Sequence, residues 1–130
     1  MEKIVLHNRY RLHEPLGKGS FGEVFAGVDL LTGTKVAVKL EPYSRKKHSQ
    51  LSFESKLYHE LRHVSCVPRT HYFGRVGEYN ALVMDRLGPS IDTFFTEHGN
   101  RLKPNIVCSI AINALKAMKE IHSMGLFIEI

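Results

Sequence analysis

Three closely spaced glycines and one lysine are the residues of this sequence whose types and spacing best fit a chemical role. The glycines stand at positions 17, 19 and 22, and Lys39 ends the run Val36-Ala37-Val38-Lys39. A glycine lets the backbone come close to a ligand because it has no side chain, and N–H groups exposed in this way can face phosphate oxygens. Lys39 can add a positive charge beside them. Phosphate binding is therefore the first hypothesis.

The residues after the glycines distinguish two kinds of phosphate loop. In dinucleotide-binding folds the spacing G-x-G-x-x-G closes a strand and opens a helix. Here the segment 23–29 alternates and is rich in strand-forming residues, which predicts a second strand. In the third strand Val36 and Val38 share one face, so Lys39 points to the other face, under the glycine turn. A glycine hairpin followed by a lysine-bearing strand is typical of protein kinases, and the alternative is a chance glycine turn.

Glu54 is the charged residue on the apolar stripe of a helix predicted at 50–63. The residues at helical spacing are Leu51, Glu54, Leu57, Tyr58 and Leu61. A carboxylate on the core-facing side of a helix needs a partner because an unpaired buried charge is costly. Lys39, on the strand just upstream, is the natural partner. The alternative is a glutamate at the edge of the stripe that reaches water.

The elements that must position these residues form an α+β unit. Strands are predicted at 10–17, 22–29, 34–41, 70–75 and 79–84, with the helix at 50–63 inserted after the third. Pro42 ends the third strand because it lacks an N–H. Two further helices are predicted at 91–97, capped by Ser90, and at 104–124, stopped by Gly125. Residues 1–9 are interpreted as a short leader.

The composition bounds the class of protein. The chain has 130 residues, 43% of them hydrophobic, which suffices for the core of one domain or of a piece of a larger one. The net charge is +5, and the basic run 45–48 is interpreted as a solvated loop or, alternatively, as a site for acidic peptides or anions. No nucleic-acid motif and no membrane segment is predicted. Cys66 and Cys108 lack metal or redox spacing, so we expect free thiols and a cytoplasmic or nuclear location.

These motifs resemble the protein kinase family, and within it the casein kinase 1 group of serine/threonine kinases. The general kinase motifs are Gly17-x-Gly19-x-x-Gly22-x-Val24, Val36-Ala37-Val38-Lys39 and the helix residue Glu54. The motifs specific to the group are Phe53-Glu54-Ser55-Lys56-Leu57-Tyr58, Leu87-Gly88-Pro89-Ser90 and Ile121-His122-Ser123. The resemblance implies a kinase N-terminal lobe at 10–87, made of a five-stranded antiparallel sheet plus one helix. The first two helices of an incomplete C-terminal lobe would follow at 88–130.

The resemblance also implies which residues bind ATP. Residues 17–24 would cover the phosphates, and Lys39 would hold the α- and β-phosphates while pairing with Glu54. Lys39 and Glu54 are thus the predicted positioning pair for catalysis. The whole predicted nucleotide site consists of Leu16, Gly17, Lys18, Gly19, Ser20, Phe21, Gly22, Val24, Ala37, Lys39, Met84, Asp85, Leu87 and Ser90.

The resemblance also implies which residues of this set would contact the adenine and the ribose of ATP. Val24 and Ala37 would face the adenine ring, and Met84 would be the gatekeeper at the end of the fifth strand. The backbone of Asp85 and Leu87 would hydrogen-bond adenine. Ser90 would lie near the ribose. The sequence departs from the group's pattern at Asp85-Arg86 and at Thr93, which replaces an acidic residue, and the second departure is expected to weaken contacts with the ribose.

Phosphoryl transfer also needs a base that orients the substrate hydroxyl and an acidic ligand for Mg²⁺. In the family these come from a His-Arg-Asp loop with a following Asn and from an Asp-Phe-Gly turn. The aspartates of the sequence are Asp29, Asp85 and Asp92, predicted to end a strand, to lie in the hinge and to open a helix. None suits either role, so no metal ligand is predicted. Family members continue into His-Arg-Asp where this sequence has Glu129-Ile130.

The expected protein is a casein kinase 1-like serine/threonine kinase sequence that is truncated before its catalytic loop and inactive alone. Its expected partners are ATP, with Mg²⁺ in the family, and protein substrates or kinase scaffolds. Without later helices, the Ile106–Met118 face of the long helix would lose its cover. Two alternatives stay open: a non-catalytic interaction module that competes for partners of full-length kinases, and an incomplete form of a working kinase.

Overall fold

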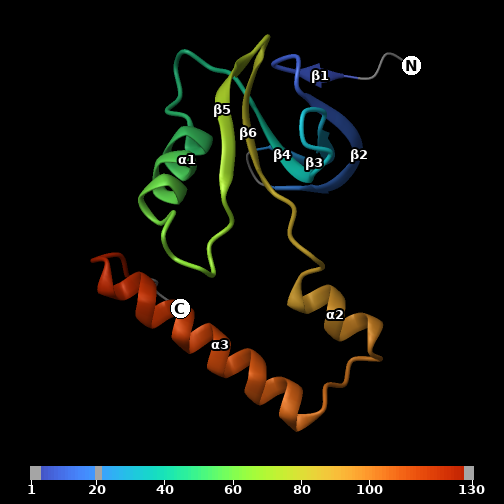
Figure 1. The fold of residues 1–130 in the computed structure, drawn as a ribbon, viewed down its shortest axis with the longest axis vertical. Coiled ribbons are helices and arrows are strands. Elements are labelled where there is room, and N and C mark those ends of the chain that lie inside the picture. The colour runs from blue at the N-terminus through green and yellow to red at the C-terminus, as the bar shows by residue number, and fades with distance from the viewer. Residues whose placement is uncertain (1–3, 20–21, 128–130) are drawn as a thin grey trace. The chain divides into compact units, whose positions relative to one another are not determined.

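The computed structural model describes residues 4–19 and 22–127 and divides the chain into two units. The first unit comprises Met1–Arg62 and Val67–Leu87, and the second comprises His63–Cys66 and Gly88–Ile130. The first unit holds the sheet and one helix, and the second holds two helices (Figure 1). The predicted α+β class is confirmed.

An antiparallel sheet forms the first unit (Figure 1). Its strands are β1 (Val5–Leu6), β2 (Tyr10–Lys18), β3 (Glu23–Asp29), β4 (Lys35–Pro42), β5 (Thr70–Val76) and β6 (Tyr79–Asp85). The order across the sheet is β1-β2-β3-β4-β6-β5, so β6 lies between β4 and the edge strand β5. As predicted, the third long strand ends at Pro42.

The predicted number of five strands is wrong, because the described part of the chain contains a sixth. Val5 and Leu6, inside the segment interpreted as a leader, pair with β2 as strand β1. His7 and Asn8 form the connecting turn with φ of 50° and 53°, the left-handed values that a tight hairpin turn requires. Leu6 is buried in the core, which holds the short strand in place. A two-residue strand leaves too little alternation to be recognised in a sequence.

The alternation of side chains along the strands produces two separate cores, one on each face of the sheet. One face buries Leu6, Tyr10, Leu12, Val36, Val38, Ala81 and Val83. The other face buries Ala37, Leu82 and Met84 against Leu51. Leu51 belongs to α1 (Gln50–Glu60), which contacts β5 and β6 (Figure 1). The face that carries Lys39 is therefore the face covered by the helix.

Helix α1 begins where predicted and ends three residues before the predicted position 63. Ser49 is its N-cap, and the Ser49 Oγ accepts a hydrogen bond from the Ser52 N–H at 2.9 Å. At the other end the Arg62 side chain donates to the His59 carbonyl at 2.8 Å, satisfying one of the last free carbonyls. The stripe predicted for this helix is present, with Leu51 and Leu61 buried and Glu54 half-buried.

The second unit contains α2 (Ile91–Glu97) and α3 (Pro104–Ser123), with the starts that were predicted. The Ser90 Oγ caps α2 by accepting from the Thr93 N–H at 3.1 Å, and Pro104 occupies the first turn of α3. Gly125 follows α3 with φ of 82°, the left-handed conformation common just past a helix end. No side chain within α2 or α3 is buried.

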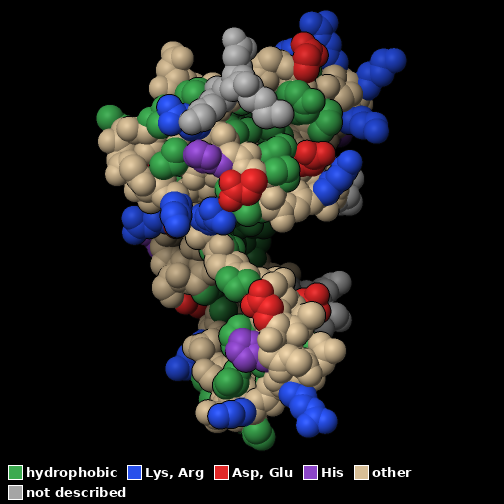
Figure 2. Space-filling view, turned by 90° about the vertical axis from the view of Figure 1, so that its right-hand side faces the viewer, with side chains coloured by type: hydrophobic (Ala, Val, Ile, Leu, Met, Phe, Trp, Pro, Cys, Tyr) green, Lys and Arg blue, Asp and Glu red, His purple; other side chains and the backbone are tan. Residues whose placement is uncertain are grey.

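Charged side chains of both signs lie on the face of the molecule drawn in Figure 2, where lysines and arginines form small separate groups among other residues. The basic run 45–48 is exposed in the loop between β4 and α1. The predicted absence of nucleic-acid binding stays a prediction. Among the residues that the structure describes, no helix has both the length and the apolar character needed to cross a membrane.

Candidate functional site

Lys39 and Glu54 form an ion pair on the helix-covered face of the sheet. The Lys39 Nζ donates to the Glu54 Oε1 at 2.6 Å, and the two side chains are 26% and 19% exposed. Strand β4 supplies the lysine and α1 supplies the glutamate, so the pair joins sheet and helix. The predicted pairing is confirmed. Burial of most of both side chains makes the pair stronger than a surface salt bridge, since water screens it less.

Tyr58 adds an aromatic ring and a phenol to this pair. It lies one helical turn after Glu54 and packs against the core formed by Ala37, Leu51, Leu82 and Met84. Burial and the adjacent Glu54 carboxylate raise the pKa of Tyr58 to about 12, so its phenol stays protonated. From the sequence, Tyr58 is expected in the apolar stripe and in the group-specific motif at 53–58, but its contact with the carboxylate is not predicted. The spacing i, i+4 from Glu54 was the available signal for its contact with the carboxylate.

The glycine turn joins β2 to β3, next to the lysine-bearing strand. The Gly19 N–H donates to the Gly22 carbonyl at 2.7 Å and closes the turn. A Cβ at Gly22 would collide with the Leu40 carbonyl oxygen, whereas a Cβ at Gly17 would meet open space. Gly22 is thus required for the close approach of the turn to β4. Ser20 and Phe21, also predicted for this site, lie outside the described residues.

Apolar residues of the predicted set share the face that carries Lys39. Val24 lies directly opposite Lys39 in the β3–β4 pair, and Ala37 lies opposite Met84 in the β4–β6 pair. Directly opposed residues of an antiparallel pair point to the same face of the sheet. The register therefore brings Val24, Ala37 and Met84 together with the Lys39 ammonium, although they come from three different strands.

Three other members of the predicted set are at the ends of strands. Leu16 and Lys18 belong to β2, where Leu16 is exposed and Lys18 forms an exposed ion pair with Glu23 at 3.7 Å. Leu87 follows β6 and is also exposed. An exposed ion pair of this length contributes little to stability.

The model of the protein kinase domain matches residues 10–128 of the sequence, nearly the whole chain. The chain belongs to the protein kinase family. Members of this family bind ATP with Mg²⁺ and phosphorylate proteins. In this member of the family, strand β4 carries Lys39 and helix α1 carries Glu54, and the two form an ion pair.

The residues of this kinase fit the phosphate end of ATP. Lys39 supplies a fixed positive charge, held by Glu54 at 2.6 Å. The turn at Gly19 and Gly22 brings backbone close to β4 with no Cβ in the way. Among residues 4–19 and 22–127, no group of three or more His, Cys, Asp or Glu side chains is arranged to hold a metal ion.

The Asp85 carboxylate is hydrogen-bonded to other residues of the chain. The carboxylate accepts from the Arg69 N–H at 3.0 Å and bonds the His71 ring at 2.7 Å. Burial raises the pKa of Asp85, but these bonds outweigh it and hold the pKa below its ordinary value. The Asp85 N–H donates to the Arg69 carbonyl at 2.9 Å. The adenine contacts of Asp85 and Leu87 stay predictions.

The remaining aspartates and Ser90 are also explained by local structure. Asp29 is buried and accepts two hydrogen bonds from the Arg9 guanidinium, at 2.8 and 2.7 Å. Asp92 is the acidic residue in the first turn of α2, where it suits the helix dipole. Ser90 belongs to the second unit and caps α2. Its implied contact with the ribose stays a prediction.

Proposed function

We propose that this chain is the ATP-binding part of a casein kinase 1-like serine/threonine kinase. The observation that carries the proposal is the Lys39–Glu54 ion pair, at 2.6 Å, on the same sheet face as Val24, Ala37 and Met84. ATP supplies the γ-phosphoryl group that protein kinases transfer to a hydroxyl. Lys39 binds the α- and β-phosphates through its ammonium, and Glu54 keeps that ammonium oriented.

The other members of the site bind the rest of the nucleotide. The glycine turn covers the phosphates with its backbone, and the Gly19 N–H closes that turn by donating to the Gly22 carbonyl at 2.7 Å. Val24 and Ala37 provide an apolar surface for the adenine ring, and Met84 limits the depth of the space behind it. These roles follow the kinase pattern of strand, glycine turn and lysine strand.

The assignment to the casein kinase 1 group rests on the motifs at 53–58, 87–90 and 121–123. Two of them have local roles that fit their residue types. Tyr58 lies beside the Glu54 carboxylate, and the Ser90 Oγ caps α2. The family match does not favour the alternative of a non-catalytic interaction module.

The 130-residue chain by itself is proposed to bind ATP without transferring phosphate. Asp29 bonds Arg9, and Asp85 bonds Arg69 and His71. Asp92 lies in the first turn of α2. We therefore infer that none of the three aspartates of the sequence serves as the base or as a ligand of Mg²⁺. Kinases need both groups for transfer. ATP binding and ATP turnover are therefore separable properties of this chain.

Thermal unfolding with and without MgATP tests the first property, and transfer of radiolabelled phosphate to an acidic serine peptide tests the second. We expect MgATP to raise the melting temperature of the wild-type chain but not of Lys39→Ala, and we expect no labelled peptide. No stabilisation of the wild type would exclude ATP binding by this site. Peptide labelling that Lys39→Ala abolishes would exclude the proposed inactivity.

A further inference from the structure

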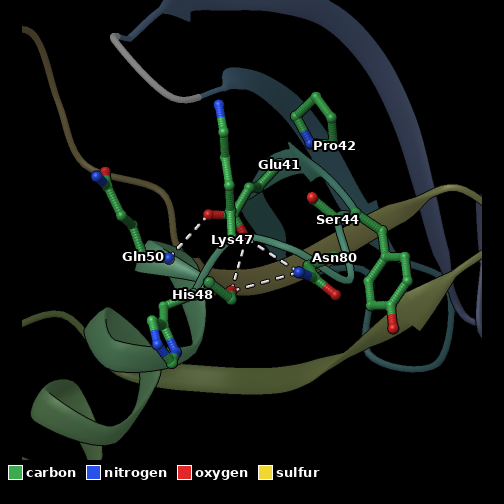
Figure 3. Close-up of a pocket in the computed structure, with 9 residues that line it drawn as sticks. Glu41, Pro42, Ser44, Lys47, His48, Gln50 and Asn80 are labelled. Carbon is green, nitrogen blue, oxygen red and sulfur yellow. Dashed lines mark hydrogen bonds between the residues drawn. The ribbon is translucent and has the colours of Figure 1, made fainter.

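Glu41 is a buried carboxylate that the kinase pattern does not use. It stands on β4 two residues after Lys39 and is 8% exposed. Its two oxygens accept four hydrogen bonds. The donors are Ser49 Oγ at 2.6 Å, Gln50 N at 2.9 Å, Asn80 Nδ2 at 3.0 Å and Leu51 N at 3.3 Å. Figure 3 shows Gln50 and Asn80 on two sides of the carboxylate, joined to it by dashed lines.

Two of these donors are backbone N–H groups in the first turn of α1. The first N–H groups of a helix have no partner within the helix, and the helix dipole favours a negative charge at this end. Burial raises the pKa of Glu41, but the bonds from Ser49, Asn80 and the two N–H groups outweigh it, so the pKa lies below its ordinary value. Glu41 is therefore an ionised cap that a neighbouring strand supplies to α1.

The bonds of Glu41 connect three elements to the Lys39–Glu54 pair. Alternation along β4 puts Glu41 and Lys39 on the same face, and Glu41 lies directly opposite Asn80 in the β4–β6 pair. Glu54 follows Gln50 in α1 by four residues, which is about one helical turn. A carboxylate that holds the first turn of α1 to β4 thus controls how far Glu54 is from the strand that carries Lys39.

We propose that Glu41 is a positioning residue for ATP binding: by capping α1 from β4 it keeps Glu54 within reach of Lys39. This inference rests on the proposed function of the Lys39–Glu54 pair. Glu41 also borders a pocket of about 400 Å³, together with Tyr43, Ser44, Lys47 and His48. Because its four bonds all go to the chain's own groups, the carboxylate acts as a structural anchor at this pocket.

A double-mutant cycle in the 130-residue chain separates positioning from general stability. MgATP affinity is measured for Glu41→Ala, for Glu54→Ala and for the double variant, with Glu60→Ala, an exposed glutamate of α1, as the matched control. We expect Glu41→Ala to weaken binding by about tenfold in the wild-type background and by less than about twofold in the Glu54→Ala background. Equal losses in both backgrounds, or no loss in the first, would overturn the proposal.

The charge of Glu41 permits a second test that does not depend on ATP. Aspartate is normally as good an N-cap as serine. Here Ser49→Asp would put a carboxylate against that of Glu41, so we expect amide hydrogen exchange across residues 50–57 to accelerate by about tenfold or more. Adding Glu41→Gln removes the repulsion and should restore most of the protection. Equal exchange in Ser49→Asp and the double variant would contradict the proposal.

The two tests also distinguish failure of this proposal from failure of the proposed function. If the wild-type chain does not bind MgATP, the proposed function fails, and hydrogen exchange alone then decides whether Glu41 anchors α1. If Glu41→Ala does not fold, Glu41→Gln replaces it in the cycle, because it removes the negative charge from the first turn of α1 and keeps the size of the side chain. An equal loss of affinity for Glu41→Gln in the wild-type and Glu54→Ala backgrounds would also overturn the proposal.

Discussion

The two units of this chain differ in how completely they bury their apolar residues. In the first unit Val38, Leu51 and Leu82 have no exposed surface. In the second unit α3 has no buried residue, and Leu115 is 66% exposed. Every described residue of the Lys39–Glu54 site except Ser90 belongs to the first unit. The contrast shows that the candidate site is built on the unit whose side chains are held by dense packing.

The apolar stripe of α3 between Ile106 and Met118 is partly buried. Ile106, Ile110 and Met118 are half-buried, and Ala114 is exposed. A helix with an apolar stripe gains most of its stability from packing that stripe. We therefore expect the first unit to supply most of the free energy of unfolding of this chain, and substitutions in the two units to have very different effects.

The largest expected effect is that of truncating the core of the first unit. Leu82→Ala leaves a cavity at a fully buried position and should lower the free energy of unfolding by about 2–5 kcal/mol. Leu115→Ala, the same change on α3, should cost less than about 0.5 kcal/mol. Urea unfolding followed by circular dichroism measures both. Similar losses for the two variants would mean that the units are equally well packed.

The glycine turn offers the next largest effect. Gly22→Ala forces a Cβ against the Leu40 carbonyl, and we expect a loss of about 1–3 kcal/mol in the free energy of unfolding. Gly17→Ala, near the end of β2 just before the turn, is the matched control, because its Cβ would meet open space, and its effect should stay within about 0.5 kcal/mol. Urea midpoints compare the two. If both glycines tolerate alanine, the turn does not approach β4 closely.

Acid should destabilise the first unit through Asp29. The bond to Arg9 is the largest of the effects that hold the pKa of Asp29 well below its usual range. A lowered pKa in the folded chain stabilises it above the unfolded pKa, near 4, and this stabilisation is lost as the pH falls toward the folded value. Asp29→Asn should therefore be less stable at pH 7 and lose less stability between pH 5 and pH 3.

Urea midpoints of the wild type and of Asp29→Asn at pH 7, 5 and 3 test this pH dependence. Arg9→Gln removes the partner of the Asp29 carboxylate and should also reduce the loss of stability between pH 5 and pH 3. An unchanged slope in both variants would show that the ion pair between Arg9 and Asp29 does not contribute to the acid response.

The smallest expected effect is local to the second unit. Ser90→Ala removes the cap of α2 and should destabilise that helix by about 1 kcal/mol, which speeds hydrogen exchange of the Thr93 amide. The urea midpoint of the whole chain should stay the same. Ser109→Ala, at an exposed position of α3, is the control. A lower midpoint in Ser90→Ala would mean that α2 contributes to the cooperative unfolding of the first unit.

The parts of this fold that were predictable from sequence are the elements whose apolar residues follow a regular period. Alternation in β4 and the helical stripe of α1 placed Lys39 and Glu54 on facing surfaces, and their ion pair follows from that pattern. Strand β1 was not predicted because a strand of two residues has no alternating pattern of apolar and polar side chains. The pairing of Arg9 with Asp29 was missed because it joins residues twenty positions apart.

The anchor at Glu41 was missed for a related reason. Its donors come from the N-terminus of α1 and from Asn80, which is 39 positions away. No local pattern links a strand glutamate to a helix that begins after a loop. Only the register of β4 with β6, together with the position of α1, brings these groups together.

Direct titration with MgATP tests most directly whether Lys39 binds nucleotide phosphates in this kinase. Calorimetry would compare the wild-type chain with Lys39→Ala and with Lys35→Ala, which removes an exposed lysine from the start of the same strand. We predict saturable binding of one ATP, weakened by at least about tenfold, or about 1.4 kcal/mol, in Lys39→Ala and unchanged in Lys35→Ala. Equal affinities of all three chains, or no saturable binding by the wild type, would contradict the assignment of this site.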